Sequence, residues 1–223
     1  MKKYFDFLIT NPLFRGVTDE GLTKLLGCVK PTEESFKKGG IILPAGQKTD
    51  RFGILLCGKG VIAHEDFWGN RNIISPLLPG QIFGEVFALK SGAVTTVGVF
   101  AESDCEVLWI KSESLLSSCT EICPCHAAVT RNLIGLLAEK NLKMNEKIIH
   151  MAKRTTRQKL MSFLSAKAAE AKSESFTVDM DRQQLADYLS VERSAMCAEL
   201  SRLQKDGYLS YKGNRFRLSG RNI

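Results

Sequence analysis

The sequence predicts an α+β protein with three successive parts: an antiparallel β-roll of the jelly-roll type, a long helix, and a C-terminal winged helix-turn-helix. Short apolar runs separated by glycine and proline turns fill residues 35–108, a pattern typical of antiparallel sandwiches and barrels. A helical pattern then runs without a strong breaker, and two short helices followed by a hairpin come after it. At 223 residues the chain is too long for a winged helix alone. We place the parts at 1–125, 126–151 and 152–223.

The first part begins with a predicted helical stretch over residues 4–28. Thr18 precedes Asp19 and Glu20, which is a helix start signal with acids in the first turn. Beyond Ser35 the pattern changes to strands and turns. The expected strands cover residues 41–43, 52–57, 61–64, 73–78, 97–101 and 105–110.

Residues 127–151 are predicted to form one long helix. Its apolar side chains recur at helical spacing, so they form a stripe with one asparagine in its middle. The stripe and its asparagine are Val129, Leu133, Leu137, Asn141, Met144 and Ile148. Such a stripe is expected to pack on its copy in a second chain, with Asn141 as a polar register mark. Periodicity alone leaves open the alternative of a core helix in a monomer.

A helix-turn-helix is predicted from Asp181 to Leu203. Asp181 and Gln184 have the spacing of a capping box, and the first helix breaks near Ser190. In the second helix the apolar residues Met196, Leu200 and Leu203 share one face. The opposite face and the first turn carry Arg193, Ser194, Ala198, Ser201 and Arg202. An ordinary helical hairpin would show the same period, so the segment that follows is needed to decide.

That segment predicts a wing beside the second helix. Gly213-Asn214 is a hairpin turn between two short alternating runs, and Lys212 and Arg215 flank it at the tip. Cations at the helix start and at the wing tip are suited to phosphates. We therefore predict DNA binding.

Charge and composition agree with this prediction. The net charge is +7, and residues from Ala152 onward hold 14 Lys/Arg against 8 Asp/Glu, whereas the first 151 residues hold 17 against 16. The positive potential therefore belongs to the part that would meet a polyanion. No apolar run is long enough to span a membrane and no signal peptide is evident, so we expect no membrane partner. Seven cysteines without regular spacing indicate reduced thiols in a cytoplasm.

The segment Pro79-Gly80-Gln81-Ile82-Phe83-Gly84-Glu85, together with the glycines at 46, 58, 60 and 69, resembles the effector domain of the CRP/FNR family of bacterial transcription regulators. The order of β-roll, long helix and winged helix extends the resemblance over nearly the whole chain. It implies a cytoplasmic homodimer that is not an enzyme. Such a dimer would bind a palindromic site on double-stranded DNA, respond to an effector in the β-roll and act with RNA polymerase.

The resemblance also locates an effector pocket. Family members that bind cyclic AMP carry a Gly-Glu pair for the ribose and, further along, an Arg-Ser or Arg-Thr pair for the phosphate. Gly84-Glu85 match the first pair, but Thr95-Thr96 stand at the second, with no arginine between Arg71 and Arg131. A buried phosphate without a cation is costly. We therefore expect an unknown small-molecule effector other than cyclic AMP, in a pocket formed by Phe83, Gly84, Glu85, Val86, Thr95 and Thr96.

The same resemblance adds positions to the DNA site. Arg182 and Gln183 match phosphate-contacting positions of the family. Many members read bases with an Arg-Glu pair and then, three and four residues on, Ser or Gly followed by Arg, where this chain has Arg193-Ser194 and Cys197-Ala198. The target sequence therefore cannot be transferred. The predicted site is completed by Glu192, Cys197 and Asn214.

Four potential soft-metal ligands lie close together before the long helix: Cys119, Cys123, Cys125 and His126. They leave open a regulator that senses metal or oxidant. The run is compact and broken by Pro124, and the N-terminal cysteine cluster of iron–sulfur members is absent, since the first cysteine is Cys28. We favour small buried thiols leading into a helix and expect no metal. A regulatory protein that binds a ligand without reading DNA is the remaining alternative.

Overall fold

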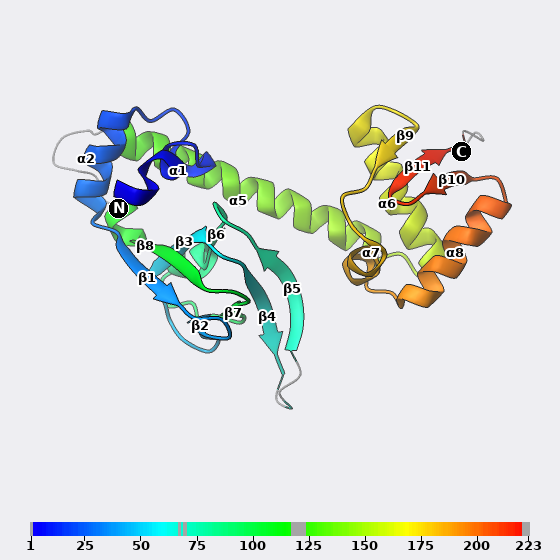
Figure 1. Ribbon diagram of the computed structural model, residues 1–223, viewed down its shortest axis with the longest axis horizontal. Helices are drawn as coiled ribbons and strands as arrows, with labels where there is room; N and C mark the ends of the chain where they lie inside the picture. The colour runs from blue at the N-terminus through cyan, green and yellow to red at the C-terminus, as the bar shows by residue number, and fades with distance from the viewer. Residues whose placement is uncertain (1, 67, 69–70, 117–123, 220–223) are drawn as a thin grey trace. The chain divides into compact units, whose positions relative to one another are not determined.

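The structure is a computed structural model that describes residues 2–66, 68, 71–116 and 124–219. The chain divides into two compact units, Met1–Leu137 and Ala138–Ile223. Each has its own helices and strands (Figure 1) and its own hydrophobic core. Helix α5, Pro124–Met151, contributes its first part to the N-terminal unit and its last part to the C-terminal unit.

The N-terminal unit opens with short helices instead of the single helical stretch predicted over 4–28. These are η1 Lys2–Tyr4, α1 Phe5–Ile9, η2 Pro12–Phe14 and α2 Asp19–Val29. Asn11 caps the start of η2, where its side chain accepts a hydrogen bond from Leu13 N. Gly16 then adopts a φ of +79°, a backbone conformation that favours glycine and ends helical geometry. Thr18 caps α2 as predicted, because its side chain accepts from Gly21 N.

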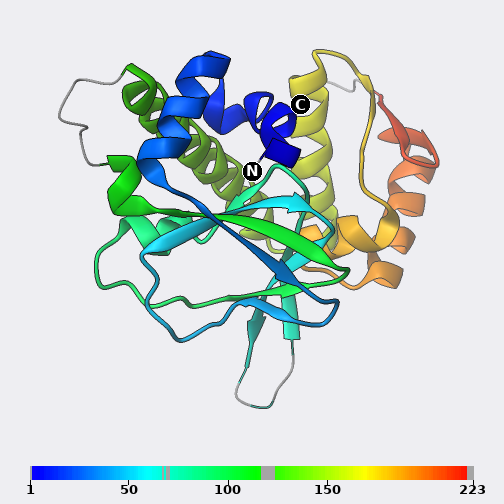
Figure 2. The ribbon, with the colours of Figure 1, turned by 60° about the vertical axis from the view of Figure 1, so that its left-hand side comes forward.

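The described strands of this unit form two four-stranded sheets, ordered β1-β8-β3-β6 and β2-β7-β4-β5, in which the described pairings are antiparallel. The strands are β1 Thr32–Phe36, β2 Ile41–Leu43, β3 Arg51–Cys57, β4 Gly60–Glu65, β5 Arg71–Leu77, β6 Ile82–Phe83, β7 Gly98–Ala101 and β8 Cys105–Lys111. Figure 2 shows α1 and α2 at one end of these strands. The predicted antiparallel β-roll is confirmed.

Strand β1 is one of two strands of this unit that the sequence pattern missed; the other is the two-residue β6. Residues Thr32–Phe36 of β1 pair with Cys105–Trp109 of β8, yet their side chains are almost all exposed. An exposed edge strand has no apolar alternation, so its polar sequence resembles a loop. Two short helices complete the unit, α3 Glu85–Leu89 and α4 Ser112–Leu116.

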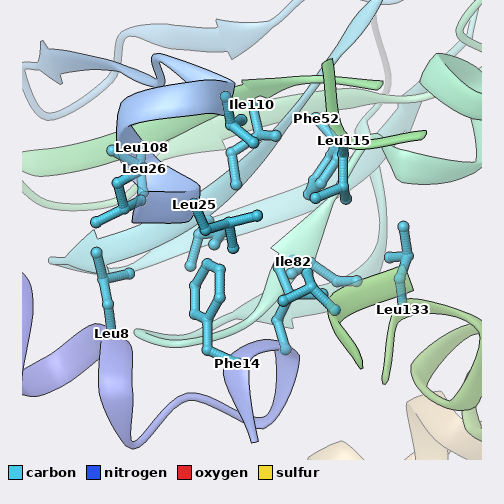
Figure 3. Close-up of a cluster of buried hydrophobic side chains, with 14 of the residues drawn as sticks. Leu8, Phe14, Leu25, Leu26, Phe52, Ile82, Leu108, Ile110, Leu115 and Leu133 are labelled. Carbon is cyan, nitrogen blue, oxygen red and sulfur yellow. The ribbon is translucent and has the colours of Figure 1, made fainter. Parts of the chain in front are cut away.

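The core of the N-terminal unit joins its helices to one of its sheets. Leu8, Phe14, Leu25, Phe52, Ile110 and Leu133 are among its fully buried members, and Figure 3 shows them converging from α1, η2, α2, β3, β8 and α5. Val129 and Leu133 of α5 are 0% and 1% exposed. The beginning of the long helix therefore belongs to this core.

The C-terminal unit packs three helices against a small antiparallel sheet ordered β10-β11-β9. Its elements after α5 are α6 Thr156–Ala171, β9 Ser175–Thr177, α7 Arg182–Leu189, α8 Arg193–Lys205, β10 Leu209–Lys212 and β11 Arg215–Leu218. Leu160, Phe163, Leu185, Met196 and Phe216 lie in its core. The predicted winged helix-turn-helix is confirmed.

Candidate nucleic-acid interface

Local hydrogen bonds fix both ends of α7: a capping box at its start and backbone bonds in the turn that leads to α8. Asp181 Oδ1 accepts from Gln184 N at 2.8 Å, and Asp181 N donates to Gln184 Oε1 at 2.9 Å, so the predicted capping box is present. Ser190 ends α7 with a φ of +50°, and Val191 N donates to Ala186 O at 3.0 Å. Backbone hydrogen bonds in the turn therefore help to set the direction in which α8 leaves α7.

Helix α8 separates its residues cleanly into a buried face and an outer face. Met196, Leu200 and Leu203 are each 0% exposed, as the spacing predicted. The residues predicted to face DNA from this helix are exposed, apart from the half-buried Cys197: Glu192, Arg193, Ser194, Ala198, Ser201 and Arg202. The outer face is thus presented to solvent along the whole helix.

Four charged side chains on or near this face form ion pairs with one another. Arg202 Nη1 lies 3.2 Å from Glu199 Oε2, and Glu199 also pairs with Arg157 at 3.3 Å. Arg157 in turn lies 2.9 Å from Asp206, and hydrogen bonding to that carboxylate raises the pKa of Arg157. Arg193 has no ion pair within the described part of the chain. Its donors are therefore available at the start of α8.

Glu192 and Ser194 interact with each other at the start of α8. Ser194 Oγ donates to Glu192 Oε1 at 2.5 Å, and Glu192 does not cap the helix with its side chain. Its carboxylate lies beside Arg193 in sequence and would repel a phosphate at the helix N-terminus. In a DNA groove, a carboxylate such as this one can accept a hydrogen bond from the amino group of cytosine.

The wing is a hairpin in which Lys212 pairs with Arg215 across the turn. Lys212, Asn214 and Arg215 are exposed. Because side chains alternate along a strand, Arg217 lies on the same face of β11 as Arg215. This face is hollowed over about 540 Å³, and its lining includes Lys212, Arg215 and Arg217 beside the hydroxyls of Ser175, Thr177 and Ser210. Arg217 was not among the residues predicted to face DNA, although the alternation of side chains along a strand places it beside Arg215.

Arg182 occupies a different environment from the other predicted contacts. Its Nη2 donates to Gly213 O at 2.6 Å. Its guanidinium carbon lies 5.2 Å from the centroid of the Tyr211 ring and 5.0 Å from that of Phe216. Gln183, the next residue, is exposed and donates to Asp187 Oδ1 at 2.8 Å. The first turn of α7 is thus tied to the wing through Arg182.

The predicted effector pocket contains buried and exposed residues. Phe83 and Glu85 are 1% and 3% exposed, whereas Val86 is 56% exposed and Thr96 is also exposed. Gly84 has a φ of +76° at the start of α3. The Phe83 ring lies edge-on to Trp109 with centroids 5.3 Å apart, and a Cβ at Gly53 would lie 2.2 Å from this ring. The interior of the roll at this point is filled by aromatic side chains.

Thr95 is buried and holds a loop closed. Its hydroxyl lies 2.8 Å from Pro44 O and 3.0 Å from Gln47 O, and it accepts from Gln47 N at 3.1 Å. Its backbone N–H also donates to Gln47 O at 2.8 Å. The position where a phosphate-binding arginine would stand therefore carries a short side chain whose hydrogen bonds are made within the protein.

Comparison with known proteins agrees with this geometry. The family model for the cyclic nucleotide-binding domain matches residues 33–121, and that for the Crp-like helix-turn-helix domain matches residues 158–222. Together they cover more than half of the chain, in the order found here. The chain belongs to the CRP/FNR family of transcription regulators. A search of curated protein sequences gives no match.

Solved structures of CRP/FNR regulators share the fold. The c-di-GMP responsive global regulator CLP of Xanthomonas campestris is 17% identical with a TM-score of 0.59, covering 92% of this chain and 100% of that chain. CprK complexed with OCPA is 13% identical with a TM-score of 0.65, covering 88% and 91%. A putative cAMP-binding regulatory protein from Silicibacter pomeroyi DSS-3 is 20% identical with a TM-score of 0.51, covering 99% and 95%.

The cysteine cluster of this CRP/FNR chain falls partly outside the described residues, since Cys119 and Cys123 lie there. Cys125 is half-buried against the N-terminal core, and its Sγ lies 2.7 Å from the position of a Cβ at Gly21. His126 is 7% exposed. Within the ranges that the structure describes, no group of three His, Cys, Asp or Glu side chains could hold a metal ion. Among the described helices, none is long and apolar enough to cross a bilayer.

The predicted dimerisation stripe divides along α5. Val129 and Leu133 are buried in the N-terminal core and Leu137 packs against it. Asn141, Met144 and Ile148 are exposed. Ile134 and Met151 are 62% and 37% exposed, and they extend the exposed part of the stripe at both ends with spacings of three and four. Together they form one heptad pattern, the exposed seam, in which only Leu137 is half-buried: Ile134, Leu137, Asn141, Met144, Ile148 and Met151.

Proposed function

We propose that this CRP/FNR chain is a homodimer that binds a palindromic site on double-stranded DNA and responds to a small-molecule effector other than cyclic AMP. The observation that carries the proposal is the outer face of α8. It is exposed along its length, opposite a fully buried face, and it begins with Arg193 in the first turn. Side chains there meet base edges when a recognition helix docks in the major groove.

Reading and holding fall to different residues. Arg193 is placed to donate to a guanine, the commonest specific contact of an arginine. Ser194, Ala198 and Ser201 would line the groove behind it. Lys212 and Arg215 stand on the wing tip, where phosphates are within reach but base edges are not. Base preference should therefore depend on α8, and affinity for any duplex should depend on the wing.

The exposed seam of α5 supports assembly into a dimer. Met144 and Ile148 are 63% and 58% exposed, which is unusual for a run of large apolar side chains in a monomer. Their heptad spacing favours a parallel coiled coil, and Asn141 lies at one of its inner positions, where a buried asparagine specifies register. Two recognition helices must lie about one DNA turn, roughly 34 Å, apart to read a palindrome.

The effector is proposed to bind the β-roll, and Thr95 supports the exclusion of cyclic AMP. Thr95 stands where the arginine would be, and its hydroxyl is bonded within its own loop. A desolvated phosphate would lack a partner there. The half-buried packing of Cys125 favours a small-molecule effector over a thiol or metal switch. Contact with RNA polymerase belongs to the proposal through the family alone.

Selection of binding sites from random duplexes tests the central proposal. We expect a palindromic consensus and a dimer in native mass spectrometry, which would also retain a tightly bound effector. Calorimetry with cyclic AMP at physiological salt should show no binding of micromolar strength. Recovery of duplexes with no shared sequence would refute sequence reading, and a micromolar constant for cyclic AMP would refute the effector assignment.

A further inference from the structure

We propose that Arg182 positions the wing and does not itself bind phosphate. This inference rests on the proposed DNA binding and changes the role of one predicted contact. It gives the hairpin of two four-residue strands a side-chain clamp in addition to its pairing with β9.

The contacts of Arg182 all lead to the wing. Its Nη2 donates to the carbonyl of Gly213 in the hairpin turn at 2.6 Å. Its planar guanidinium lies near the rings of Tyr211 on β10 and Phe216 on β11, a distance range in which cation–π attraction operates. One side chain therefore touches both strands of the wing and the turn that joins them.

The surroundings of this contact are built as a stack of rings. Tyr211 and Phe216 are stacked with centroids 5.8 Å apart, and Phe216 and Phe176 with centroids 6.0 Å apart. Tyr211 pairs directly with Phe216, and Phe216 with Phe176, across the sheet. The arginine thus lies against a continuous aromatic surface, which a lysine could not match with a planar group.

Arg182 is half-buried and directs its guanidinium toward the wing, which makes it a poor phosphate ligand. Its Nη1 is buried and has no hydrogen-bond partner among the described residues, so a phosphate oxygen could reach it only if the wing moved. The exposed cations Lys212 and Arg215 are not so restricted. A separate backbone hydrogen bond, from Val178 N to the carbonyl of Asn214 at 2.9 Å, holds the turn between these two charges.

The decisive experiment compares four chains: the parent, Arg182→Gln, Lys212→Ala/Arg215→Ala, and the combination of all three changes. Their affinities for one selected duplex are measured over a series of salt concentrations. If Arg182 acts through the wing, Arg182→Gln should weaken binding about tenfold in the parent. The same change should weaken binding less than about twofold once the wing cations are gone, because Arg182 then has no wing charges left to position.

A direct phosphate contact predicts a different result. Arg182→Gln would then weaken binding equally in both backgrounds and would lower the salt slope by about one in each. That result, or no loss in the parent, would overturn the proposal. Tyr211→Leu is the second variant, for use also if Arg182→Gln does not fold. It keeps the arginine charge but removes part of its platform, so a positioning role predicts a loss that is not additive with that of Arg182→Gln.

Amide hydrogen exchange without DNA tests the clamp separately from DNA binding. Arg182→Gln should speed exchange at Val178 N and in the wing, whereas Gln183→Ala, a change in the same helical turn, should not. Unchanged exchange in Arg182→Gln would overturn the clamp. Failure of the parent chain to bind any duplex would instead count against the proposed function and leave this measurement intact.

Discussion

His150 Nδ1 lies 2.8 Å from Ser162 Oγ, so the last turn of α5 is hydrogen-bonded to α6. The imidazole is 4% exposed. It stands edge-on to Phe163 with centroids 5.8 Å apart and tilted to Tyr188 at 6.4 Å. The C-terminal end of the proposed dimerisation helix is therefore part of the core of the unit that carries α7 and α8.

This contact predicts that the C-terminal unit loses stability in mild acid. Burial lowers the pKa of His150 below its ordinary value of 6.5, Lys167 and Lys153 lower it further, and Glu146 opposes them. Lys147, over the Tyr188 ring at 5.5 Å, adds a further cation nearby. Below about pH 6.5 the unfolded chain binds a proton that the folded chain does not, so the free energy of unfolding falls until the pH passes the lowered pKa.

Hydrogen exchange of α6 and α7 amides between about pH 5 and 8 measures this effect, after correction for intrinsic exchange. Tryptophan fluorescence would not serve for this unit, because both tryptophans, Trp68 and Trp109, lie in the N-terminal unit. His150→Gln should flatten the dependence, whereas His64→Gln, at an exposed position on β4, should not. A dependence that survives His150→Gln would assign it to another group.

Arg193→Ala should reduce base preference. The change removes a donor from the first turn of α8, so it is expected to cost about 1–3 kcal/mol on the selected site and to flatten the preference at one base pair. Lys212→Ala is the matched control on the wing. It should weaken binding to all duplexes alike and lower the salt slope by about one. Site selection and salt titration on both variants make the measurement, and a preference lost with Lys212 but kept without Arg193 would contradict the assignment.

Met144→Glu should dissociate the dimer. Met144 is 63% exposed in the single chain and lies on the proposed seam, so two carboxylates would be buried together at a cost of about 3–5 kcal/mol. This position is better suited to the test than Leu137, which also packs on the N-terminal core. Light scattering gives the mass. Lys143→Glu, an exposed position off the seam, should remain a dimer, and a dimeric Met144→Glu would exclude this seam.

Thr95→Val should destabilise the N-terminal unit without changing the volume of the side chain greatly. The N–H of Gln47 and the carbonyl of Pro44 would lose their hydrogen bonds to the hydroxyl, at about 1–3 kcal/mol. Urea unfolding followed by the fluorescence of the buried Trp109 reports on this unit. Thr96→Val, at an exposed neighbour, should stay within about 0.5 kcal/mol of the parent. Equal stabilities of the two variants would show that the loop does not depend on Thr95.

Periodic burial explains what the sequence could predict. Met196, Leu200 and Leu203 share one face at spacings of four and three, and all are buried. The capping box of α7 was likewise visible as Asp181 and Gln184, because its hydrogen bonds are local. Strand β1 was missed because an exposed edge strand carries no apolar pattern.

The roles of single side chains were less visible, because they depend on contacts between distant segments. Arg182 was expected at a phosphate, and only the packing of the wing brings it to Tyr211 and Gly213. The apolar stripe of α5 likewise mixed two functions. Periodicity placed Val129 and Met144 on one stripe, but the first is buried within its own chain and the second is exposed. Tertiary packing decides between these, and a helical period does not.

The division of α5 between two cores bears on how the protein can be dissected. A DNA-binding fragment that began at Lys153 would lack His150 and would leave the rings of Phe163 and Tyr188 without their neighbour. One that began at Ala138 would keep this packing. Conversely, an N-terminal fragment ending before Val129 would open a cavity in its own core. The cut expected to leave both fragments folded runs through the middle of α5 and not through residues 152–155, which join α5 to α6.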